Sequence, residues 1–190
     1  MIELKRALAG AAVVLACTAT GAVAEDADYE VYLSKYISEQ MKLALTAPEV
    51  VAAIQAQNAA NANLTEADID ALDREWRAEA KTFGGTLVNG TMSNATSAFL
   101  RGFKAASGGV IAEIFIMDNK GLNVAQTDPT SDYMQGDEDK WQKTYGVGVW
   151  RTFTDVPEDG TVQVSMTVSD NDKAIGAMTV GINIAKLPRQ

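Results

Sequence analysis

The chain has 190 residues, with 25 Asp and Glu against 16 Lys and Arg, a net charge of -9, one Cys and no His. An acidic chain without a basic stripe is excluded from binding along a nucleic-acid phosphate backbone. The absence of His excludes His-based metal sites and Ser-His-Asp triads, and the single Cys17 excludes a disulfide framework. We therefore predict no metal, no cofactor and no catalytic residues, and a protein that is not an enzyme.

The first 24 residues are typical of a secretory signal peptide. Lys5 and Arg6 precede an apolar run over residues 7–16, and Ala22-Val23-Ala24 forms a small-residue cleavage site. We expect cleavage after Ala24, so that the mature chain begins at Glu25 in the periplasm.

Two alternative interpretations of this N-terminal segment remain open. The sequence Val14-Leu15-Ala16-Cys17 can be interpreted as a lipobox, in which Cys17 becomes the lipidated first residue. An uncleaved anchor is the third alternative, although Thr18, Thr20 and Gly21 interrupt the apolar run that it requires.

Helical periodicity extends over the N-terminal half of the mature chain. Larger apolar residues recur every three or four positions from Tyr29 to Leu45, and Pro48 stands where the first turn of a further helix tolerates it. Thr65 and Asp68 predict a capping box at the start of a second helix. A third helical segment is expected over residues 93–106, with its buried face carrying Ala95, Phe99 and Phe103.

The period changes to two after Val110. Alternation is clearest over Thr161–Ser169, where Val and Met alternate with small polar residues. Short links between strands predict an antiparallel meander whose apolar face is covered by the helices, hence an α+β fold with one five-stranded antiparallel sheet. Residues 25–109 and 110–190 are expected to form one structural domain. The predicted strands cover residues 110–117, 122–127, 149–155, 161–169 and 174–184, with a short helix over 137–145.

Two stretches carry a resemblance to a known family. Residues 115–145, FIMDNKGLNVAQTDPTSDYMQGDEDKWQKTY, contain a D-x-x-G turn, a Tyr-containing loop and a short Trp-bearing segment, and residues 175–184 read IGAMTVGINI. In this order the two stretches resemble bacterial single-Cache sensor modules, which are PAS-like and extracellular or periplasmic. The resemblance covers most of the mature chain.

The resemblance implies a small-molecule pocket between the sheet and the segment from Asp128 to Tyr145. Cache modules that bind amino acids have an Arg two residues before the Trp and an Asp in the closing strand. Here Asp139 precedes Trp141, and Gly181 stands at the strand position. Amino-acid binding through that motif is therefore not expected.

The aromatic residues and cations of this region are the main candidates for ligand contacts. Tyr133, Trp141 and Tyr145 combine apolar rings with polar tips, which suits a small-molecule pocket, and Trp141 and Tyr145 share a helical face. Arg151 can clamp a carboxylate through two hydrogen bonds, with Lys140 as a second cation. The alternatives are that the rings pack a loop onto the sheet and that the cations face solvent.

The polar face of the late strands supplies further candidates. Gln163 and Thr179 are expected to line the pocket, because a PAS-like sheet packs helices on one face and encloses ligand on the other. Exposure of this face to solvent is the alternative. Asp132 completes the set of predicted ligand contacts.

The function expected from these observations is that of a periplasmic sensor or ligand-binding module. It would capture a small anionic organic molecule and report in trans to a membrane-bound sensor kinase or chemoreceptor. The alternative is a ligand-free interaction or assembly protein, which would use its N-terminal helix as a homodimer or docking face. Neither hypothesis includes a nucleic-acid partner.

Overall fold

The computed structural model describes residues 22–82, 84–147, 151–152 and 160–189, and for 22–28 and 151–152 it describes the backbone alone. Most of the predicted signal peptide lies outside these ranges. So does most of the strand predicted over 149–155.

The N-terminal helices form one long row. It consists of α1 (Ala22–Tyr36), a π-helical turn (Ile37–Met41), α2 (Lys42–Leu45) and α3 (Pro48–Ala60), whose Pro48 occupies the first turn as predicted. The stripe of Leu33, Ile37 and Met41 is fully buried. A spacing of four exceeds the 3.6 residues of an α-helical turn, so the stripe would drift around a regular helix. The wider π turn reduces that drift.

Three separate helices follow: α4 (Glu66–Lys81), α5 (Thr86–Ser93) and α6 (Ala95–Ala106). The predicted capping box of Thr65 and Asp68 at the start of α4 is confirmed. No helix was predicted over α5, because its β-branched residues and a central glycine have low helix propensity.

The buried face of α6 lies one residue further along the chain than the sequence predicted. Ala95 is exposed, whereas Thr96, Ser97 and Leu100 are buried and Phe99 and Phe103 are partly buried.

The sheet has five antiparallel strands in the order β2-β1-β5-β4-β3. The predicted α+β class with one five-stranded PAS-like sheet is confirmed, but the meander is wrong, because β5 lies between β1 and β4. β5 is buried along most of its length, which suits the centre of a sheet, and the short β2 and β3 form the edges. The strands are β1 (Ile111–Met117), β2 (Asn123–Gln126), β3 (Arg151–Thr152), β4 (Thr161–Asp170) and β5 (Lys173–Asn183), with the short helix α7 (Asp139–Gln142) before β3 and a 3-10 turn (Ile184–Lys186) at the end.

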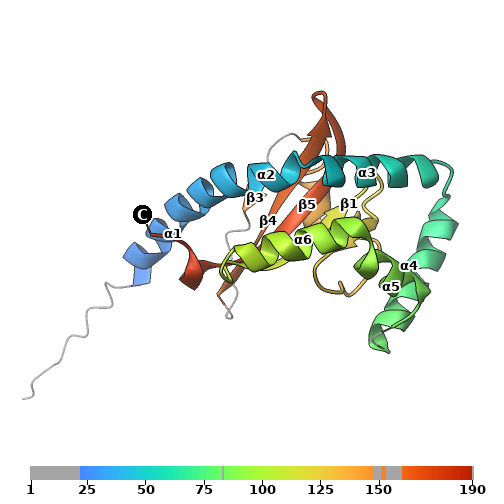
Figure 1. Ribbon diagram of the computed structural model, residues 1–190, viewed down its shortest axis with the longest axis horizontal. Coiled ribbons are helices and arrows are strands. Elements are labelled where there is room, and N and C mark those ends of the chain that lie inside the picture. The colour runs from blue at the N-terminus through green and yellow to red at the C-terminus, as the bar shows by residue number, and fades with distance from the viewer. Residues whose placement is uncertain (1–21, 83, 148–150, 153–159, 190) are drawn as a thin grey trace, which may run out of the picture.

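The main core lies between one face of the sheet and the helices. In Figure 1 the α1–α3 row and α6 lie side by side in front of the sheet, while α4 and α5 lie at one end. Every second residue of β4 points into this core, as predicted from the alternation: Val162, Val164, Met166 and Val168. Among the described residues, no helix is both long and apolar enough to cross a membrane.

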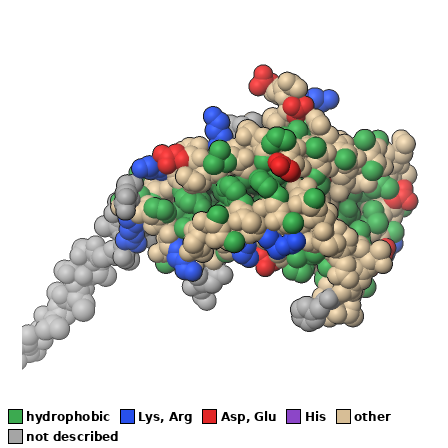
Figure 2. Space-filling view, in the orientation of Figure 1, with side chains coloured by type: hydrophobic (Ala, Val, Ile, Leu, Met, Phe, Trp, Pro, Cys, Tyr) green, Lys and Arg blue, Asp and Glu red, His purple; other side chains and the backbone are tan. Residues whose placement is uncertain are grey.

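Part of the apolar surface on the helical side stays accessible. Figure 2 shows hydrophobic side chains along the seam between the N-terminal helices and α6. The partly buried aromatic residues that pack on the core from these helices are Tyr29, Tyr32, Tyr36, Phe99 and Phe103.

Candidate ligand-binding site

A row of aligned strand positions crosses the sheet, and its described side chains lie on the second face, opposite the helices. The strand register aligns Gln126, Phe115, Thr179, Ser165 and Arg151 from β2 to β3. Ser165 and Thr179 are both 0% exposed, and Gln126 and Phe115 are also buried. The alternative that this polar face is open to solvent is therefore wrong for the centre of the row.

The polar groups of this row are only partly satisfied by one another. The hydroxyl oxygens of Ser165 and Thr179 lie 2.9 Å apart and share one hydrogen bond. The Gln126 amide donates to the sulfur of Met92 at 3.5 Å, while its carbonyl oxygen has no hydrogen-bond partner among the described residues. Burial of an unpaired carbonyl costs free energy, so this row favours a donor from elsewhere.

A second row on the same face brings a carboxylate into the site. Glu113 of β1 and Gln163 of β4 flank Gly181 of β5, and the Gln163 amide donates to Glu113 Oε1 at 2.9 Å. A Cβ at Gly181 would lie 2.9 Å from the Glu113 side chain, so the glycine makes room for it. A carboxylate thus stands beside position 181, where the chain lacks the Asp of amino-acid-binding Cache modules.

The segment around α7 covers this face. Trp141 packs on Phe115, Met117 and Ala177. Lys140 Nζ lies 5.3 Å from the centroid of the Phe115 ring, and its side chain is 15% exposed and paired with Glu138 at 2.8 Å. This arrangement places one cation directly above the buried row.

Trp141 and Tyr145 form a stacked pair, with ring centroids 4.7 Å apart. The Trp141 indole N–H donates to the backbone oxygen of Asp118 at 3.4 Å. Burial and the Asp118 charge raise the pKa of Tyr145. Tyr145 also lines a separate cavity of about 330 Å³ that includes Asp170 and Lys173.

Asp118 organises the D-x-x-G turn between β1 and β2. One carboxylate oxygen accepts from the backbone N–H groups of Lys120 and Leu122, at 2.8 and 2.9 Å. The other accepts from the side-chain amides of Gln57 and Asn61, at 3.1 and 2.9 Å. The motif thus fixes the β1–β2 turn against α3.

Two predicted site residues lie on another side, against α4. Tyr133 stacks on Trp76 with ring centroids 5.3 Å apart, and burial together with the charge of Asp118 raises its pKa to about 12. Asp132 is buried and paired with Arg77 at 3.1 Å. The structure therefore does not bring Tyr133 and Asp132 together with Lys140.

The predicted residues thus fall into distinct places. Thr179 belongs to the first row and Gln163 to the second, and Lys140 and Trp141 cover the face. Arg151 lies opposite Ser165 in the strand register, and its side chain lies outside the described part.

Gln126, Glu113 and Phe115 were not predicted as site residues. Glu113 is the one polar residue of the otherwise apolar β1, and this break in the pattern is the signal that could have identified it. Gln126 has no such signal, because its strand also contains Asn123.

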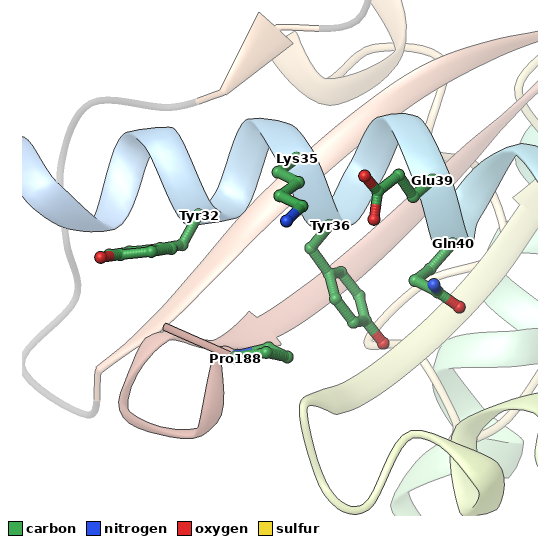
Figure 3. Close-up of a pocket in the computed structure, with 6 residues that line it drawn as sticks. All are labelled: Tyr32, Lys35, Tyr36, Glu39, Gln40 and Pro188. Carbon is green, nitrogen blue, oxygen red and sulfur yellow. The ribbon is translucent and has the colours of Figure 1, made fainter. Parts of the chain in front are cut away.

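A further cavity, of about 240 Å³, lies beside the N-terminal helix row. Figure 3 shows Tyr32, Tyr36 and Gln40 on the helix, with Pro188 on the C-terminal segment next to them. None of the residues predicted as ligand contacts lines it. In the described part of the chain, His, Cys, Asp and Glu side chains form no cluster that could hold a metal ion.

Comparisons with known proteins found similarity in solved structures alone. No family model matches the chain, and no curated protein matches it. The sensor domain of the V. cholerae histidine kinase DctB is 12% identical, with a TM-score of 0.46, over 87% of this chain and 54% of that chain. The E. coli DcuS sensor domain is 11% identical, with a TM-score of 0.48, over 85% of this chain and 95% of that chain.

The sensory domain of the Campylobacter jejuni chemoreceptor Tlp3 is 14% identical, with a TM-score of 0.39, over 84% of this chain and 65% of that chain. This chain thus spans about half of the DctB chain and nearly all of the DcuS chain. These three are sensor domains, the kind of module that the sequence resembles. The fold class itself follows from the strand order and the placement of the helices.

Proposed function

We propose that this chain is a non-enzymatic periplasmic sensor module that binds a small anionic organic molecule on the second face of its sheet. The buried polar row of Gln126, Thr179 and Ser165 carries the proposal. Sheet faces that serve only for packing are apolar, because burial of polar groups costs free energy unless they are hydrogen-bonded. A polar ligand makes use of the groups that the row leaves partly unpaired.

The charges around the row support a carboxylate as the anionic group. Lys140 lies above Phe115 and is mostly withdrawn from solvent. Arg151 lies opposite Ser165 in the strand register, and we propose it as the second cation, which binds the ligand carboxylate through two hydrogen bonds. Trp141 forms the apolar wall next to them.

Reporting to a membrane partner is the second part of the proposal. Ligand binding under the α7 segment would change how that segment packs on the sheet, and the hydrogen bond from Thr167 to the Thr144 carbonyl, at 2.6 Å, connects it to β4. We propose that a membrane-bound sensor kinase or chemoreceptor detects this change in trans.

A thermal-shift screen of mono- and dicarboxylic acids, each with its neutral amide, tests the proposal. A ligand at a hundred times its dissociation constant stabilises the native state by about 2.7 kcal/mol, which raises the melting temperature by roughly 5 to 11 °C. We expect such a shift for at least one acid and none for its amide. Stabilisation by amides or amines but not by acids would contradict an anionic ligand.

Two lysines of the same segment provide a matched pair of variants. Lys140→Met should abolish the shift, because it removes the cation above the row. Lys143→Met should retain it, because Lys143 pairs with Asp139 at an exposed position. If both variants lose the thermal shift equally, the shift depends on the overall charge of the segment and not on Lys140, which would contradict the proposed site.

Exposed apolar residues on the N-terminal helices favour the alternative function of a docking or homodimer face. Val31 is 67% exposed and Leu43 is 63% exposed. A dimer through this face would dissociate in a Val31→Glu, Leu43→Glu double variant, as sedimentation velocity can measure. If the wild type is monomeric and shows a carboxylate-dependent thermal shift, only the sensor proposal remains.

A further inference from the structure

The largest of the three cavities described lies between α4, α5 and residues 129–131, and no residue of the sheet strands is among its described lining residues. Its volume is about 500 Å³, within the range of small-molecule sites. Ala80, Val88, Met92 and Pro129 form its apolar wall. Asn89 and Thr130 contribute polar groups, and none of the described residues that line it carries a charge.

Local contacts fix the corner between α4 and α5 that forms this cavity. The Glu79 carboxylate at the end of α4 accepts from the backbone N–H of Val88 at 2.8 Å. A Cβ at Gly85 would lie 2.0 Å from the Glu79 side chain, so only glycine at this position lets the carboxylate reach α5. The cavity thus has a wall that is held in place by hydrogen bonding.

Two buried amides lie directly behind this wall. Gln126 donates to the sulfur of Met92 at 3.5 Å, and Asn123 donates to the hydroxyl of Thr130 at 2.7 Å. Both amides are fully buried, and the carbonyl oxygens of both have no hydrogen-bond partner among the described residues. Buried acceptors of this kind are normally paired. Both amides contact the cavity through its lining residues Met92 and Thr130 and do not line it themselves.

We propose that this cavity is a second binding site, which takes a small neutral molecule with an apolar body and one hydroxyl group. The apolar wall binds the body, and the polar groups at Asn89 and Thr130 orient the hydroxyl. A charged ligand would lose its hydration without gaining a countercharge. The two proposed sites share Gln126, which contacts Met92, but this proposal involves neither Lys140 nor Arg151.

Trp76 offers a direct readout of occupancy. It is fully buried, and its indole N–H donates to the backbone oxygen of Thr130 at 2.9 Å. A molecule that contacts Thr130 therefore changes the environment of this N–H group. Since the chain has three Trp residues, an NMR spectrum of protein with isotope-labelled tryptophan contains few indole signals, and Trp76→Phe identifies the one of interest.

The test is a titration of the full chain with benzyl alcohol, with benzoate and benzylammonium as charged analogues of the same size. We expect a saturable shift of the Trp76 indole signal with benzyl alcohol and none with the charged analogues. A shift that does not saturate, or saturation by benzoate or benzylammonium, would overturn the proposal.

Two variants that close the cavity, and one that does not, complete the experiment. Ala80→Leu fills the interior and Asn89→Phe covers the exposed rim, so each should abolish the shift. Ala78→Leu adds the same bulk at an exposed position of α4 and should leave it unchanged. If Ala80→Leu fails to fold, Asn89→Phe still decides, because it adds no volume to the core. Retention of the shift in a folded Asn89→Phe variant would exclude the cavity as the site.

Discussion

The ammonium of Lys140 lies over the ring of Phe115 on the second face of the sheet, 5.3 Å from the ring centroid. An ammonium over an aromatic face is attracted by the negative electrostatic potential of the ring. The same ammonium is also paired with the Glu138 carboxylate at 2.8 Å. The cation is therefore positioned before any ligand binds, which reduces the loss of side-chain entropy on binding.

Glu113 provides the first test of the charge balance at this site. Its carboxylate lies on the same face of the sheet as Phe115, so it repels an anionic ligand. Glu113→Gln keeps the shape and still accepts the hydrogen bond from Gln163. We expect carboxylate affinity, measured by calorimetry, to rise about tenfold, which corresponds to about 1.4 kcal/mol.

Glu75→Gln, at an exposed position of α4, is the matched control and should not change affinity. Weaker binding in Glu113→Gln would mean that this carboxylate contacts a positive group of the ligand.

The hydrogen bond between Ser165 and Thr179 can be measured by a double-mutant cycle. Ser165→Ala or Thr179→Val alone leaves one buried hydroxyl without its partner and should cost about 1 to 3 kcal/mol in the free energy of unfolding. The double variant should cost less than the sum of the two, because it removes both hydroxyls. Additive costs in urea unfolding would show that the two hydroxyls do not interact.

Asp73 connects α4 to the loop that carries Tyr133. Its carboxylate accepts from the backbone N–H groups of Tyr133 and Met134, at 2.9 and 3.0 Å, and from Arg77 at 2.6 Å. Burial opposes ionisation, but the Met134, Arg77 and Tyr133 hydrogen bonds together lower the pKa of Asp73 below its usual value of 3.8. Asp73→Asn should therefore cost about 1 to 3 kcal/mol of stability at neutral pH.

The pH dependence of that cost follows from the lowered pKa. Because the folded-state pKa of Asp73 lies below the unfolded value, the carboxylate stabilises the fold above pH 3.8, and this contribution disappears as pH falls through the folded-state pKa. Urea unfolding of wild type and Asp73→Asn should thus differ at pH 7 and converge toward low pH. The exposed Asp70→Asn is the control. A difference that is constant with pH would exclude the charge as its cause.

Export is tested by the intact mass of the periplasmic protein. Cleavage after Ala22-Val23-Ala24 should give a mature chain whose first residue is Glu25. A mass that includes a diacylglycerol on Cys17 would identify a lipoprotein instead. A mass of the full 190 residues would indicate the uncleaved anchor.

Local patterns in the sequence were sufficient for most of the secondary structure. The capping box of Thr65 and Asp68, Pro48 at a helix start and the alternation over residues 161–169 each depend on neighbours within a few positions, so they can be read without the fold. The unpredicted α5 has no such pattern, because packing against β2 and α4 stabilises it rather than helix propensity.

The tertiary structure alone decided the strand order and the composition of the candidate site. No pattern within the sequence of β5 predicts that it pairs with β1. This pairing aligns Phe115 with Thr179. Likewise, Tyr133 and Lys140 are seven positions apart in the sequence, yet one contacts α4 and the other the sheet. The sequence by itself determined most of the elements and the acidic, His-free chemistry, because these depend on residue identity and short-range periodicity. Which polar side chains become buried neighbours depends on contacts between distant strands, and only the folded chain determines them.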